Sequence, residues 1–278
     1  LEVGGDLFGN PEMTFSYEVH EDGTEEAESQ ETGSQGTESQ EDEAQILIVG
    51  YTGEAKQVRI PAKTTIHGKD YHIAIYGEVM FSGDGMTQVD FLAAEDGSKV
   101  TVSGKSLEAC FSSCEELQRV DLSGLDTSTV ENFKSMFSDD ASLESVEMSG
   151  MDTSAAADIS EMFEYDTSLK EADLSGWNVS NVLTAQEMFT GCESLQSVSL
   201  SGWQADNLQD MANMFSGCVS LTEADISGAD FPKLADAGRM FYDCKNLQTL
   251  DLSEMEFPML HHADGMFSMD DEIGRAHV

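Results

Sequence analysis

From Phe111 onward, apolar residues recur along the chain with a fixed period of 26 residues. One position of this period is always phenylalanine: Phe111, Phe137, Phe163, Phe189, Phe215, Phe241 and Phe267. Methionine directly precedes the last six of them, and no insertion or deletion interrupts the six units. A period held in register over so many units predicts a solenoid, in which each unit forms one coil and buries its apolar face only against neighbouring coils.

The first part of each unit has the pattern of a short strand. In one unit Leu195, Val198 and Leu200 alternate with polar residues, so that the apolar side chains point inward and the others outward. A Ser-Gly pair follows this stretch in five units and predicts a turn, because glycine tolerates the backbone angles that turns require.

The second part of each unit has helical spacing. The apolar residues of one example fall on a single helix stripe: Val182, Ala185, Met188, Phe189 and Cys192. Ser128 and Glu131 also fit a capping box at the start of the equivalent stretch. We therefore predict coils of strand, turn, short helix and turn, with the strands on one face and the helices on the other.

The remainder of the chain divides by composition. Residues 46–105 are predicted to be β-rich, and residues 106–270 hold the six repeats and the start of a seventh. Residues 1–45 contain no Lys or Arg and are almost all polar after position 20, so we expect a disordered acidic linker whose first part is the remnant of a strand. Residues 273–278 resemble one reading frame of a common sequencing adapter, and we expect 271–278 to be a non-native end.

The repeat motifs resemble a known family. Leu174-Ser175-Gly176-Trp177 and Met188-Phe189-x-Gly191-Cys192-x-Ser194-Leu195 are similar to the BspA-type leucine-rich repeats of bacterial surface proteins. The resemblance covers roughly 46–270 and implies an α/β fold: a right-handed leucine-rich-repeat solenoid with short parallel strands on one face and short helices on the other. It also implies secretion or display on the bacterial surface, and adhesion. Asp140 and Asp166 depart from the family pattern, in which cysteine is usual.

Charge narrows the range of partners. Lys plus Arg is 13 and Asp plus Glu is 54, which gives a formal net charge of -41. Such a polyanion repels nucleic acids and anionic membrane surfaces, so neither is expected as a partner. No apolar stretch is long enough to cross a membrane. Cationic proteins, metal ions and neutral glycans remain as ligand classes.

One outward strand position is acidic in nearly every unit: Asp121, Glu147, Asp173, Ser199, Asp225 and Asp251. These residues form an acidic ladder on the expected concave sheet. The ladder is either a binding surface for a cationic protein or for Ca²⁺, or a solvated face that keeps the sheet from aggregating. The outward position two residues earlier varies: Arg119, Ser145, Glu171, Ser197, Glu223 and Thr249. This variation favours a binding surface over a uniform, inert one. The candidate partner-binding residues are those of the acidic ladder together with Arg119, Glu171 and Glu223.

No catalytic, cofactor or metal site is predicted. Four cysteines share one apolar repeat position, Cys114, Cys192, Cys218 and Cys244, and with Cys110 they are interpreted as buried hydrophobic residues rather than zinc ligands or disulfides. The periodic methionines are interpreted as core, and the His261-His262 pair as solvent-exposed. Known nucleotide-binding and hydrolase motifs are absent from the sequence.

These patterns lead to one expected function and two alternatives. We expect a non-enzymatic extracellular protein that binds a host or neighbouring-cell protein or glycan through the concave sheet. An inert spacer that projects another domain from the cell surface is the main alternative, and an enzyme or metal-binding protein is the least favoured.

Overall fold

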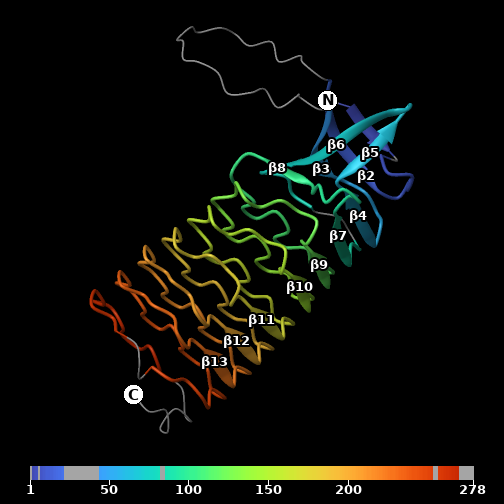
Figure 1. Cartoon of the computed structure of the whole chain (residues 1–278). Helices are drawn as coiled ribbons and strands as arrows, with labels where there is room; N and C mark the ends of the chain where they lie inside the picture. The colour runs from blue at the N-terminus through green and yellow to red at the C-terminus, as the bar shows by residue number, and fades with distance from the viewer. Residues whose placement is uncertain (1, 6, 22–43, 82–84, 253–255, 269–278) are drawn as a thin grey trace, which may run out of the picture.

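The computed structural model describes residues 2–5, 7–21, 44–81, 85–252 and 256–268, and within them the chain forms strands and turns but no helix. Figure 1 shows an N-terminal sheet followed by a regular stack of coils. None of the described residues forms a helix suited to crossing a membrane.

The N-terminal sheet has strand order β1-β2-β3-β6-β5, with β8 paired to β6. Its strands are β1 (Glu2–Gly5), β2 (Thr14–His20), β3 (Gln45–Tyr51), β5 (Lys63–Ile66), β6 (Lys69–Tyr76) and β8 (Thr101–Ser103). Within the segment predicted to be β-rich, 46–105, lie β5, β6, β8 and nearly all of β3. The first part of 1–45, interpreted as the remnant of a strand, forms β1 and β2, which pair with each other, and β2 pairs with β3. The bounds of the disordered linker predicted over 1–45 are therefore too wide. The rest of that prediction falls on residues 22–43, and the predicted non-native end on 269–278, both outside the described residues.

The coils present a second set of strands, which we call the strand face. It comprises β4 (Gln57–Pro61), β7 (Gln88–Leu92), β9 (Arg119–Asp121), β10 (Ser145–Glu147), β11 (Glu171–Asp173), β12 (Ser197–Ser199) and β13 (Glu223–Asp225). All neighbours pair in parallel, in the orders β10-β9-β7-β4 and β11-β12-β13. No strand ladder joins β10 to β11 among the described residues, so the strand face consists of two sheets. The sixth predicted strand is reduced to a single bridge from Glu223 to Thr249.

The opposite side, which we call the turn face, corrects the prediction of short helices. Backbone N–H groups there bond to the next coil instead of to their own: Phe189 N donates to Met214 O at 2.8 Å, and Gly191 N to Ser216 O at 2.8 Å. Glu187 and Gly191 have φ angles of 59° and 74°, and this left-handed conformation interrupts any helix on both sides of Phe189. Glu131, the second residue of the expected capping box, donates its N–H to Lys105 O, so the capping-box interpretation is also wrong.

The core confirms the predicted stacking of equivalent side chains. The phenylalanine column, Phe111 to Phe267 at every twenty-sixth residue, has neighbouring ring centroids 5.2–5.8 Å apart and nearly parallel planes. The column continues beyond the regular repeats through Phe81, whose ring stacks on Phe111 at 5.0 Å. Because each ring from Phe111 to Phe241 is buried between two others, stability belongs to the stack and not to single coils.

Candidate functional site

The strand face carries the predicted partner-binding residues. The first strand position, filled by Arg119, Ser145, Glu171, Ser197 and Glu223, is exposed in every coil from β9 to β13. Strand register places Glu171 beside Ser197 and Ser197 beside Glu223, and it places Asp173, Ser199 and Asp225 in the same relation. The structure therefore brings the two predicted series together as parallel rows on one surface.

The acidic ladder stabilises the turns that follow the strands, a structural role that the sequence pattern did not indicate. Four of its carboxylates accept a hydrogen bond from the backbone N–H two residues later, as Asp173 does from Ser175 (3.1 Å) and Asp225 from Ser227 (3.0 Å). Asp121 and Glu147 make the same bond at 3.0 and 2.9 Å. Such bonds stabilise the turn that ends the strand.

These hydrogen bonds also fix the charge of the ladder. The hydroxyl and backbone N–H of Ser149 lower the pKa of Glu147, and those of Ser175 lower the pKa of Asp173. The backbone N–H and hydroxyl of Ser227 likewise lower the pKa of Asp225. The carboxylates are therefore ionised at neutral pH and are held in fixed orientations, which reduces the conformational entropy that a partner would have to remove.

Two strands of this face come from the segment predicted to be β-rich, but the sequence did not indicate that they continue the face of the repeats. β4 and β7 extend it beyond the regular repeats, with Gln57 aligned to Gln88 and Gln88 aligned to Arg119. These partners are separated by 31 residues, so a search for the 26-residue period passes over them. The alternation of Val58 and Ile60 with polar residues was the available signal.

The charges at the two ends of the strand face differ. At the β4 end, Arg59 Nε lies 3.6 Å from Asp90 Oδ2, and Arg119 lies 3.8 Å from Asp121. From β10 onward, the outward positions of the strands hold only acidic, Ser and Thr residues. The strand face therefore changes from a charge-balanced end to an anionic end.

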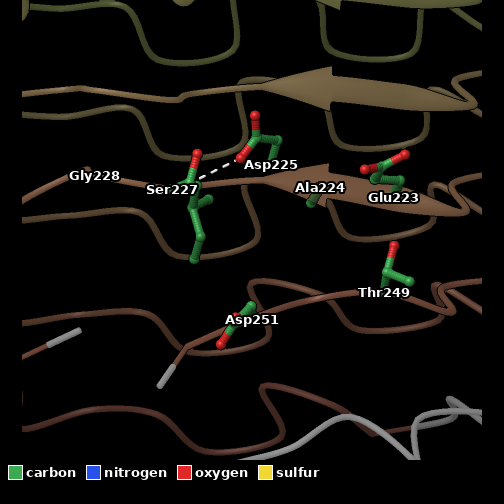
Figure 2. A pocket seen from close by; sticks show the side chains of 8 residues that line it. Glu223, Ala224, Asp225, Ser227, Gly228, Thr249 and Asp251 are labelled. Atoms are coloured by element: carbon green, nitrogen blue, oxygen red, sulfur yellow. Dashed lines mark hydrogen bonds between the residues drawn. The ribbon is translucent and has the colours of Figure 1, made fainter. Parts of the chain in front are cut away.

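A crevice opens at the anionic end, between β13 and residues 249–251. Figure 2 shows Glu223, Asp225 and Asp251 around it, with Ala224 between the first two. Its volume is about 210 Å³, and Ile226, Ser227, Gly228 and Thr249 complete its lining. At the crevice Ala224 N approaches Thr249 O only to 3.5 Å, and a single bridge replaces the ladder that joins β12 to β13. Three of the predicted residues thus line one recess.

The cysteines are unsuited to nucleophilic chemistry. All five are buried and free. Burial raises the pKa of the Cys110, Cys192 and Cys218 thiols well above the ordinary value, and that of Cys114 to about 12. The thiols therefore stay protonated at neutral pH. Among the described residues, no group of three or more potential ligands is arranged to hold a metal ion.

Comparison with known proteins identifies the repeats. The family model described as "Mycoplasma protein of unknown function, DUF285" matches residues 105–222 and 170–276. No curated protein matches the chain.

Three solved structures are similar to the chain. A leucine-rich-repeat protein of T. pallidum is 18% identical, with a TM-score of 0.44 over 75% of this chain and 85% of that one. A leucine-rich cell-surface protein of Faecalibacterium prausnitzii is 14% identical, with a TM-score of 0.34 over 79% and 72% of the two chains. A leucine-rich-repeat protein of Bacteroides ovatus is 14% identical, with a TM-score of 0.18 over 84% and 91%.

Proposed function

Since the chain belongs to the family described as "Mycoplasma protein of unknown function, DUF285", whose description states no activity, we propose a function from the geometry of the strand face. The protein acts at the bacterial surface or in the extracellular medium and binds a protein of a host or neighbouring cell. It does so through the anionic part of the strand face, from β10 to Asp251, and without catalysis.

The observation that supports this proposal is the row of fixed, ionised carboxylates along the stacked strands. Glu147, Asp173 and Asp225 are held by turn hydrogen bonds, and Glu171 and Glu223 are exposed beside them. A pre-oriented surface of one charge attracts a partner of the opposite charge and selects against others. We therefore favour a cationic protein surface over a neutral glycan as the ligand.

Biosensor binding of the full chain to a panel of extracellular-matrix proteins, mucins and glycans tests the proposal. The measurements are made at two salt concentrations, with and without Ca²⁺, and the double variant Glu171→Lys plus Glu223→Lys is compared with the original chain. We expect saturable binding to a basic protein, which weakens at high salt and falls at least tenfold in the variant. These two positions are chosen because neither side chain makes the turn bond of the acidic ladder.

The matched control is Glu193→Lys plus Asp206→Lys, a charge reversal of two exposed residues outside the strand rows. We expect it to lower affinity less than threefold. Equal losses in the two variants would show that only net charge matters, and would overturn the assignment to the strand face.

The inert spacer is the second candidate, and the turn hydrogen bonds of the acidic ladder favour it. They give Asp121, Asp173 and Asp225 a purely structural reason to be acidic. A folded chain that binds no member of the panel would support the spacer function.

A further inference from the structure

One interior position of the coils is filled by two different kinds of side chain. At every twenty-sixth residue the chain has Cys114, Asp140, Asp166, Cys192, Cys218 and Cys244. All six are buried, and the two aspartates are 0% exposed. A fully buried carboxyl group in an apolar column needs a physical explanation, because burial of its charged form is unfavourable.

The cysteines show what hydrogen bonding this position demands. Each of these four thiols lies within hydrogen-bonding distance of a phenylalanine carbonyl in an adjacent coil. Sγ of Cys192 donates to Phe163 O at 3.0 Å, and Sγ of Cys218 and Cys244 donate to Phe189 O and Phe215 O at 3.1 Å. Cys114 makes the corresponding bond to Phe81 O at 2.7 Å. The position therefore holds a hydrogen-bond donor that satisfies a backbone carbonyl.

Each aspartate accepts a backbone hydrogen bond with one carboxyl oxygen, and its other carboxyl oxygen has no hydrogen-bond partner. Oδ1 of Asp140 accepts the Cys114 N–H at 2.6 Å, and Oδ1 of Asp166 accepts the Asp140 N–H at 2.9 Å. Oδ2 of both residues is buried without a hydrogen-bond partner. By the register of the cysteines, the carbonyls at these two levels belong to Phe111 and Phe137. A proton on Oδ2 would make each aspartate a donor, like the thiols above and below.

The surroundings of both carboxyl groups also favour the protonated form. Burial raises the pKa of Asp140 to about 9, against the opposing effect of the Cys114 N–H, and the charge of Asp139 adds to the rise. Burial raises the pKa of Asp166 well above its ordinary value, and Asp140 and Asp139 contribute. The other ionisable groups nearby, Cys114, Cys192 and Glu164, are also acidic. No cation acts on either carboxyl among the described residues.

We propose that Asp140 and Asp166 are held as neutral carboxylic acids that donate from Oδ2 to the backbone, and that they form a proton-sensitive joint in the solenoid. Deprotonation would place two negative charges next to each other inside the stack. The joint lies where the strand face is interrupted between β10 and β11, so this part of the molecule opens first when the protons are lost.

The proposal predicts stability that decreases as pH rises. Each carboxyl is protonated in the folded chain but loses its proton in the unfolded chain above an ordinary aspartate pKa of 3.8. Its stabilising effect is complete below pH 3.8 and is lost as pH rises through the folded-state value of about 9 for Asp140. Within this window each carboxyl shifts the folding equilibrium toward the unfolded state by about tenfold per pH unit.

Urea unfolding of the full chain between pH 5 and pH 9 tests the joint, at constant ionic strength. The double variant Asp140→Asn plus Asp166→Asn keeps the Oδ1 acceptor and a donor but cannot titrate. In the original chain the two carboxyl groups together should change the folding equilibrium constant by about a hundredfold per pH unit, and this contribution should be missing from the variant. Asp140→Cys plus Asp166→Cys, which restores the residue of the other coils, serves as the second variant in case the asparagines disturb folding.

Glu164→Gln is the control, because burial and the charges of Glu187, Glu161 and Asp139 raise the pKa of Glu164 to about 7. This variant should lose pH dependence near and below pH 7 and keep the slope above it. Infrared spectroscopy at pH 7 gives an independent reading: the band of protonated carboxylic acids should be present in the original chain and reduced in the Asn and Cys variants. Equal pH slopes in the original chain and both double variants, or no such difference in the band, would overturn the proposal.

Discussion

The coils that carry Asp140 and Asp166 and the coils that carry Cys192, Cys218 and Cys244 have the same turn face but different strand faces. Phe137 stacks on Phe163 at 5.3 Å where the strand pairing is interrupted, and Phe189 stacks on Phe215 at 5.6 Å where it is continuous. Backbone bonds of the turn face continue through both regions. The phenylalanine column and the turn face therefore maintain the register of the coils, and the strand face tolerates a gap.

A buried indole marks the same gap. Trp203 Nε1 donates to Leu174 O at 2.9 Å, whereas Trp177 Nε1, one coil earlier, is buried without a partner. An unsatisfied buried donor is unfavourable, so the coil of Trp177 is less well stabilised on its strand side.

The largest expected effect is the loss of a ring from the phenylalanine column, which shows whether the column stabilises the two regions equally. Phe163→Ala and Phe215→Ala each remove a fully buried ring from the column and should each lower the free energy of unfolding by about 3–5 kcal/mol. Urea unfolding measures both. A loss at Phe163 that is less than half the loss at Phe215 would show that the interruption reaches the column itself.

A smaller effect isolates the indole hydrogen bond. Trp203→Phe removes the bond to Leu174 O, whereas Trp177→Phe removes a donor that has no partner. Because the volume change is the same, Trp203→Phe should be less stable than Trp177→Phe by about 1 kcal/mol in the same assay. Equal stabilities would mean that Trp177 finds a partner in solution.

The smallest effect concerns the turn after each strand. Gly202 has a φ of 74°, whereas Gly176 has a φ outside the left-handed region, and a Cβ there would contact nothing within 4 Å. We expect Gly176→Ala to stabilise the chain by about 0.4–1 kcal/mol and Gly202→Ala to destabilise it by about 1 kcal/mol. Thermal unfolding of the two variants checks the sign, and a stabilised Gly202→Ala would contradict it.

The solenoid was predictable from the sequence because its signal is redundant. The phenylalanine column, the strand positions around Val120 and Val198, and the burial of the cysteines all follow from one repeated pattern. The helices were not predictable in the same way, because a stack of tight turns and an amphipathic helix place apolar residues at the same spacings of three and four. Left-handed residues distinguish the two, and Gly191 and Gly217 were the visible sign of them.

The sequence predicted which residues of the candidate site point outward, but it did not predict the hydrogen bonds that hold them. Alternation along each strand placed Asp173 and Asp225 outward, as found. Their bonds to the N–H groups of Ser175 and Ser227 depend on turn geometry that a strand pattern does not specify. The exposed Arg59 and the largely buried Asp90 were missed because the first coils are longer than the repeats that follow.

The backbone bonds between coils have a consequence for the length of the molecule. Because the N–H of Phe189 and its equivalents must meet a carbonyl in the next coil, extra residues are accommodated within a coil only away from this bond, as in the longer coil where Phe81 N donates to Cys110 O. Whole coils escape this limit, since each addition repeats the same contacts and extends the stack by about 4.8 Å. The reach of such a chain therefore changes in equal steps of one coil, and duplicating a coil would lengthen it while leaving the surfaces of the other coils unchanged.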